Sequence, residues 1–201
     1  MPLLDQRILT EYFEQNGFFV KPLVTSRSQT KKTGKVEDSS LYIQNINFMA
    51  GGRNPAFLLF SNELRFLESA VVCVEGWYGE KSALASMKEG SEIWRHLEAN
   101  VLKKVEKWFE FDFKKEWGLK HEPKKILLAP VFPTQEQFRR QVSAALRERG
   151  VDGILSFKSV LLDLIDRVDR KQIYLSSDVM QMLRILKNFD LIKDPQMNFL
   201  G

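Results

Sequence analysis

The chain has 201 residues, of which 44% are hydrophobic and 28% are charged, and its formal net charge is +4. These proportions are typical of a soluble globular protein, and the single cysteine, Cys73, excludes an intramolecular disulfide and a cysteine-rich zinc site. The apolar runs are far shorter than the roughly 18 residues that cross a bilayer. We therefore expect one cytoplasmic domain over residues 1–201, with no membrane partner and no signal peptide.

The first predicted elements are a helix and an edge strand. Apolar residues in 4–15 recur at the spacing of an amphipathic helix, and Asn16-Gly17 is a typical helix end, because glycine accepts the left-handed conformation. A strand is expected from Phe18. Pro22 limits the length of this strand or places it at an edge of the sheet, because proline has no N–H to donate.

A polar, basic loop is expected over residues 25–38. Its first part has no acidic residue and four cationic ones, which are Arg27, Lys31, Lys32 and Lys35. Such a loop is either a solvated surface segment or a contact for the phosphate backbone of a nucleic acid.

Two further strands are expected before the middle of the chain. The alternation in 41–49 predicts a strand, and its polar residues suggest that one face is in contact with water. The run 70–74 is a buried strand, which stops abruptly at Gly76-Trp77. Glu75 is the carboxylate at its end, and ligands in α/β folds gather at the ends of such strands.

The second half of the chain alternates helical and strand patterns. Helices are expected over 82–88, 91–109, 135–149, 159–168 and 177–189, and strands over 126–133 and 153–157. Thr134 is the expected cap of the helix over 135–149. In the helix over 177–189, the candidates for the inward face are Val179, Leu183, Leu186 and also Met182. Antiparallel strands followed by αβ crossovers predict a central mixed sheet flanked by helices, with a helical part from about 158 to 201.

This order resembles the restriction-endonuclease-like PD-(D/E)XK nuclease superfamily over most of the chain. The resemblance also rests on the segments 12–20, 150–157 and 182–187, and on the strand that runs into Gly76-Trp77. In members of that family, one strand carries an Asp and the next carries Glu-x-Lys. The two carboxylates hold Mg²⁺, which activates a water for cleavage of a phosphodiester.

Carried over residue by residue, the resemblance implies a degenerate active site. The Glu-x-Lys positions fall on Cys73-Val74-Glu75, so a thiol replaces the metal-binding carboxylate and an acid replaces the lysine. The strand expected to carry the Asp has no acidic residue over 41–45. The main hypothesis is therefore an inactive, nuclease-like protein that needs no cofactor and binds nucleic acid, such as DNA, through the basic loop.

Two alternatives remain open. In the first, the protein is an Mg²⁺-dependent endonuclease with a migrated site, in which Glu75 and either Asp38 or Glu37 bind the metal and Lys81 supplies the catalytic cation. Against this alternative, Glu75 is interpreted simply as a surface residue at the end of a strand. In the second, the two C-terminal helices form a homodimer or a partner contact. No H-E-x-x-H, phosphate-binding or dinucleotide-binding motif points to another enzyme class.

Overall fold

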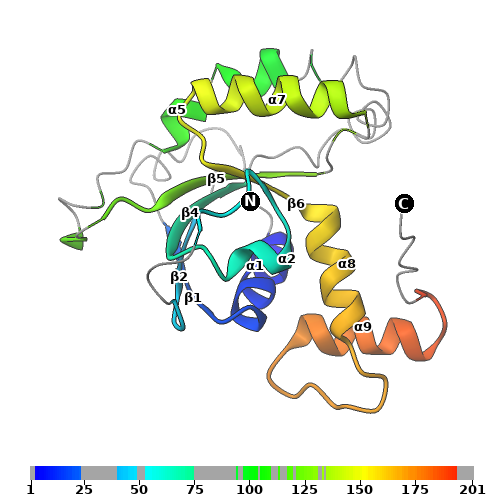
Figure 1. Cartoon of the computed structure of the whole chain (residues 1–201). Coiled ribbons are helices and arrows are strands. Elements are labelled where there is room, and N and C mark those ends of the chain that lie inside the picture. The colour runs from blue at the N-terminus through cyan, green and yellow to red at the C-terminus, as the bar shows by residue number, and fades with distance from the viewer. Residues whose placement is uncertain are drawn as a thin grey trace, which may run out of the picture.

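A mixed sheet with helices on both faces forms the centre of the computed structural model (Figure 1). The structure describes residues 3–23, 40–48, 53–74, 94, 97–103, 105–109, 113, 117–119, 121–130, 133 and 135–193. Within them the strands are β1 (Phe18–Leu23), β2 (Ser40–Asn45), β3 (Leu58–Leu59), β4 (Ser69–Val74), β5 (Lys124–Ala129) and β6 (Gly153–Ser156). The helices are α1 (Leu3–Gln15), α2 (Ser61–Leu64), the π-helix η3 (Leu97–Leu102), α5 (Val105–Trp108), α7 (Glu136–Glu148), α8 (Phe157–Arg167) and α9 (Asp178–Asn188).

The strand order is β1-β2-β4-β5-β6-β3, with antiparallel pairing at one end of the sheet and parallel pairing at the other. Leu23 pairs with Ser40, Ser40 pairs with Cys73, and Cys73 pairs with Leu127. The predicted fold class, a mixed sheet flanked by helices, is therefore confirmed. The strand that contains residues 70–74 lies between β2 and β5, at the heart of the sheet.

Two hydrophobic cores share this sheet, because successive side chains of a strand point to opposite faces. Val72 packs into the core formed with α1, α8 and α9, whereas Val71 and Cys73 face the core formed with η3, α5 and α7. In Figure 1 these two groups of helices lie on opposite sides of the sheet. Each face of the sheet is thus closed by its own group of helices.

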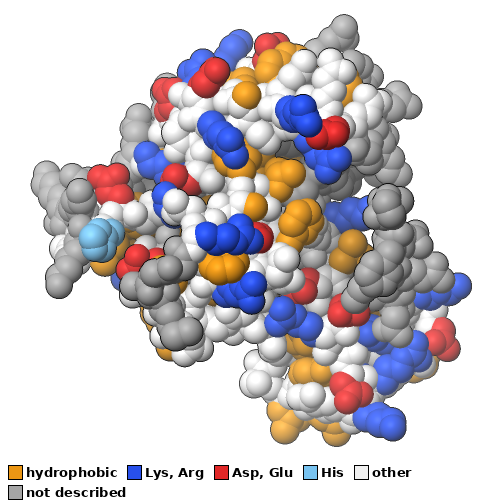
Figure 2. All heavy atoms as spheres, in the orientation of Figure 1, with side chains coloured by type: hydrophobic (Ala, Val, Ile, Leu, Met, Phe, Trp, Pro, Cys, Tyr) orange, Lys and Arg blue, Asp and Glu red, His pale blue; other side chains and the backbone are white. Residues whose placement is uncertain are grey.

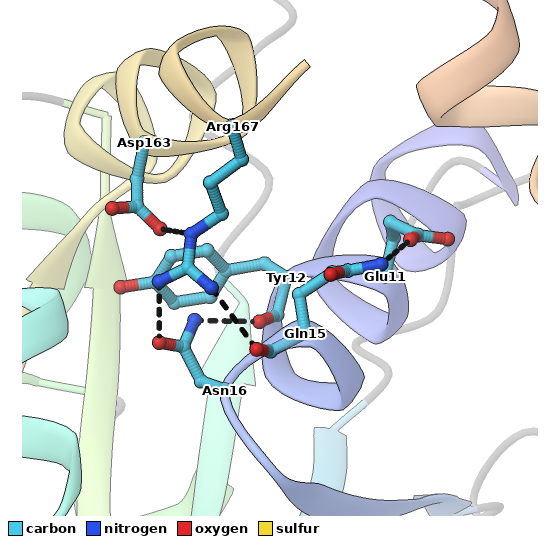
Figure 3. Close-up of polar contacts among 6 residues, drawn as sticks. All are labelled: Glu11, Tyr12, Gln15, Asn16, Asp163 and Arg167. Carbon is cyan, nitrogen blue, oxygen red and sulfur yellow. Dashed lines mark hydrogen bonds and ion pairs between the residues drawn. The ribbon is translucent and has the colours of Figure 1, made fainter. Parts of the chain in front are cut away.

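A polar clamp joins the end of α1 to α8 (Figure 3). The Arg167 guanidinium pairs with Asp163 at 2.8 Å, and it donates to the Gln15 carbonyl at 3.0 Å and to Asn16 Oδ1 at 2.8 Å. The Asn16 amide in turn donates to the Tyr12 carbonyl at 2.8 Å. Arg167 and Asn16 therefore each supply a donor to one of the carbonyl oxygens at the end of α1, where backbone carbonyls lack partners within the helix.

Local signals for turns and caps are confirmed. Gly17 and Gly150, which follow α1 and α7, have φ values of 80° and 75°, in the left-handed region that glycine tolerates. Ser177 caps α9 by accepting the N–H of Met180 at 3.1 Å. By contrast, α7 begins after Gln135, which makes no side-chain cap, and the predicted cap Thr134 lies outside the described residues.

The prediction that one face of the strand at 41–49 is wet was wrong. Leu41, Tyr42 and Ile43 are all buried, since helices cover both faces of β2. The Tyr42 ring stacks on Phe113 at a centroid distance of 5.9 Å and meets Trp117 edge-on at 5.0 Å. Gln44, near the end of the strand, is exposed.

Two predictions about helices also need correction. In place of one α-helix over 91–109, the described residues form the π-helix η3 and the separate short helix α5, although Val101 and Val105 are buried as expected. Met182, a candidate for the inward face of α9, is 45% exposed, because it lies at the margin of the buried side, about 60° around the helix from Val179 and about 100° from Leu183. The helix expected over 82–88 lies outside the described residues. Within the described ranges, no helix is both long and apolar enough to cross a bilayer.

Candidate functional site

One edge of the sheet, the one formed by strand ends and not by an outer strand, carries the positions that the nuclease resemblance assigns to the catalytic site. Because β2 is antiparallel to β1 and β4, the end of β1, the start of β2 and the end of β4 all lie at this edge, as the Leu23–Ser40 and Ser40–Cys73 pairs show. Cys73 is only 1% exposed and belongs to the core with Val105 and Leu127. At the position where the family pattern has a metal-binding carboxylate, the Cys73 thiol is therefore a small buried hydrophobic group.

The residues predicted to form the site lie outside the described part of the chain. They are Glu75 and Lys81 as catalytic groups, Asp38 or Glu37 as the second metal ligand, and Arg27, Lys31, Lys32 and Lys35 as the nucleic-acid contact. The structure thus neither brings them together nor separates them. What it does describe is β2 and β4, whose residues 40–45 and 69–74 contain no Asp or Glu. These strands do not fit an Mg²⁺ site, because that ion prefers carboxylate oxygens.

A charged cluster that the sequence analysis missed lies toward the opposite edge, in residues 53–66, which flank β3 and precede β4. Its centre is Glu63, a carboxylate in α2 that is only 7% exposed. Glu63 accepts the backbone N–H of Ala56 at 2.8 Å and pairs with the guanidinium of Arg53. The Ala56 N–H, together with Arg53, holds the pKa of the Glu63 carboxyl below its ordinary value.

Two arginines lie against one aromatic ring beside this carboxylate. The guanidinium carbons of Arg53 and Arg65 are 4.5 and 4.7 Å from the centroid of Phe66, so they are at most 9.2 Å apart, the sum of those distances. Both arginines are exposed, and within the described residues Arg65 forms no ion pair. We call Arg53, Arg65 and Phe66 the arginine platform. Figure 2 shows Lys and Arg side chains next to hydrophobic ones over α2, on the same face of the molecule.

A cavity of about 210 Å³ adjoins the arginine platform. Asn54, which follows Arg53, lines it, and so does Leu67, which follows Phe66. The lining also includes Lys124 and Asp152, whose side chains pair at 3.3 Å. This volume is below the roughly 300 Å³ of a drug-sized pocket, so the cavity suits a single small group with polar contacts.

These two edges hold the candidate features of the described chain. Among the described residues, no group of three His, Cys, Asp or Glu side chains lies close enough together to hold a metal ion. Comparison with protein-family models, with curated proteins and with solved structures found no match to this chain. A functional assignment must therefore come from the geometry itself.

Proposed function

We propose that this protein binds nucleic acid on a restriction-endonuclease-like scaffold and does not cut it. The scaffold part of the proposal is supported by the order of the strands. Antiparallel strands come first, and parallel strands joined by helical crossovers follow, with the two strands that would carry the metal site side by side as β2 and β4. The loss of cleavage chemistry is supported by Cys73, which is buried where the family pattern has a carboxylate.

The arginine platform is the observation that carries the binding part of the proposal. Arg53 is held in place by the buried Glu63, so its guanidinium is oriented before any ligand arrives. Guanidinium groups pair with phosphate oxygens through two parallel hydrogen bonds, and their planes can stack on an unpaired base. Two such groups on one ring, next to a small polar cavity, suit a phosphate backbone with an adjoining sugar or base.

The first experiment measures affinity for labelled duplex DNA, single-stranded DNA and RNA by fluorescence anisotropy over a salt series. We expect binding at low salt that weakens steeply as salt rises, because each phosphate contact releases a counterion. Arg65→Ala should weaken binding by about tenfold and flatten the salt dependence. Arg140→Ala on α7 is the matched control, since it removes an exposed arginine that pairs with Glu136 rather than with a ring. Absence of binding, or binding that ignores salt and Arg65, would contradict the proposal.

The predicted basic loop is tested in the same assay. The double variant Lys31→Glu and Lys32→Glu reverses two charges in this loop, and the control of equal charge is Lys103→Glu with Lys171→Glu, two described positions that are exposed. The loop begins after Leu23 and ends before Ser40, so it leaves the sheet at the edge opposite the arginine platform. A loss confined to the loop variant would move the binding face to that edge and leave the arginine platform without a role in binding.

A cleavage assay tests the absence of nuclease chemistry. Supercoiled and linear DNA are incubated with the protein in Mg²⁺ and in Mn²⁺, next to Glu75→Ala. We expect no metal-dependent cutting by either protein. Cutting that Glu75→Ala abolishes would establish the migrated-site alternative, with Mg²⁺ as a cofactor, in place of this proposal.

A further inference from the structure

We infer that α9 is the contact surface of a homodimer in which two copies of the helix pack antiparallel about a twofold axis. The inference is independent of the proposed nucleic-acid binding. It starts from α9 itself, which is apolar on two sides. One side is in the core through Val179, Met180 and Leu183, whereas Met182 and Ile185 on the other side are each 45% exposed.

The exposed residues form a continuous stripe. At 100° per residue, Met182, Ile185 and the following Phe189 project within about 60° of one another, and their mean direction is about 130° from that of the buried Val179, Met180 and Leu183. The stripe covers the second half of the helix and its C-cap residue. A helix that is apolar on both sides is normally covered on both.

Further hydrophobic side chains adjoin the two ends of α9. The N–H of Tyr174 donates to Gln181 at 3.2 Å and holds Ile173 and Leu175 beside the first turns, while Leu191 follows the helix end. Phe189 is 74% exposed, and Ile173, Leu175 and Leu191 are 62, 95 and 71% exposed. Figure 2 shows hydrophobic side chains projecting at the lower end of the molecule, over the loop between α8 and α9.

The exposed area matches what a dimer needs. At their exposed fractions the six side chains equal about four complete ones, which is on the order of 700 Å². That exceeds the roughly 300–600 Å² of the largest apolar patch on a typical monomer, and it approaches the roughly 800 Å² that each partner contributes to a stable interface.

The charges at the ends of the stripe favour a second copy as the partner. Asp178, which begins α9, remains 90% exposed while it pairs with Arg7 at 3.2 Å, and the exposed Lys193 follows the helix end in sequence. In an antiparallel pair, each Asp178 lies near the Lys193 of the other copy, and the helix dipoles oppose one another. A parallel pair would bring like charges together. Such a self-complementary surface is what a twofold interface requires.

Sedimentation equilibrium from about 2 to 200 µM tests the dimer. We expect the full-length protein to approach twice its monomer mass of 23.4 kDa and Ile185→Glu or Phe189→Glu to raise the dissociation constant at least about tenfold. Ile46→Glu is the matched control, because Ile46 is 71% exposed but lies in the turn after β2. Far-UV circular dichroism verifies that each variant is folded. A monomer throughout this range, or a dimer that the two stripe variants leave intact, overturns the inference.

A charge exchange tests the antiparallel arrangement. Asp178→Lys and Lys193→Asp should each weaken the dimer several-fold, and the two changes together should restore it, because the exchanged charges again face each other. If the double variant is no tighter than the single ones, the antiparallel packing is wrong. Nucleic-acid affinity is measured separately on the monomeric variants, so its loss and the loss of the dimer are distinguishable.

Discussion

Glu63, in the short helix α2, shows how a buried carboxylate stabilises the irregular segment before β3. It accepts the Ala56 N–H and pairs with Arg53, so Glu63→Gln should lower the free energy of unfolding by about 1–3 kcal/mol at neutral pH. Because these partners keep its folded-state pKa below the ordinary value of 4.5, the ionised carboxylate contributes stability above that pH. The contribution is lost as the pH falls through the folded-state pKa.

Urea unfolding at about pH 7 and about pH 4 measures this effect. The difference between the wild-type protein and Glu63→Gln should shrink at the lower pH. Glu68→Gln, at an exposed position in the same segment, serves as the control and should cost less than about 0.5 kcal/mol at either pH. Equal losses in the two variants would show that the carboxylate of Glu63 is not a structural acceptor.

Tyr12 should make the stability of the protein depend on pH in the alkaline range. Burial of its ring, and then the nearby Asp163, raise the pKa of the Tyr12 hydroxyl far above its ordinary value of 10.0. A raised folded-state pKa means that stability is fully present below about pH 10 and is lost as the pH rises further, because only the unfolded chain ionises readily. Unfolding curves at about pH 9 and about pH 11 should therefore show a steeper loss for the wild-type protein than for Tyr12→Phe. Parallel losses in the two proteins would contradict the burial of this hydroxyl.

At the scale of elements, Arg167 links α8 to the end of α1. The clamp includes an ion pair with Asp163, in which the two side chains are 33 and 21% exposed, and two hydrogen bonds to the end of α1. We expect Arg167→Ala to lower the free energy of unfolding by about 1–3 kcal/mol. Arg140→Ala is the control, because its pair with Glu136 has the same i,i+4 spacing but is fully in solvent, where such pairs contribute about 0.3–0.5 kcal/mol. Similar costs for the two variants in thermal unfolding would mean that Arg167 acts only as a surface charge.

Features that depend on neighbouring residues could be predicted from the sequence, whereas features that depend on distant parts of the chain could not. The stops at Gly17 and Gly150 and the cap at Ser177 depend on residues within one turn, and all three are as predicted. The burial of both faces of β2 could not be predicted in this way. Tyr42 is covered by Phe113 and Trp117, which are about 70 residues further along the chain.

The candidate site was harder to predict than the fold. The arginine platform brings Arg53 onto the same ring, Phe66, as Arg65, which is twelve residues further along the chain, and no motif marks that spacing. The available signal was the acidic Glu63 within the largely apolar run 57–67, because such a residue is rarely buried without a partner. The family pattern directed attention to the other edge of the sheet instead.

At the scale of the whole molecule, the shared sheet should make unfolding a single transition. Because neighbouring residues of each central strand, such as Val71 and Val72, face different cores, neither group of helices can separate without exposing the sheet. The four tryptophans all lie between residues 77 and 117, so fluorescence reports on the part of the chain that includes α5, whereas far-UV circular dichroism is dominated by the longer helices.

This coupling is tested by weakening one core and observing the other. Leu164, in α8, is fully buried in the core opposite α5, and Leu164→Ala should cost about 2–5 kcal/mol. If the sheet couples the two cores, the unfolding midpoint should fall by the same amount in tryptophan fluorescence as in circular dichroism. Leu146→Ala, in α7 on the other face, provides the reciprocal comparison and should again move both signals together. A fluorescence midpoint that Leu164→Ala leaves unchanged would mean that the two cores unfold independently in spite of the sheet between them.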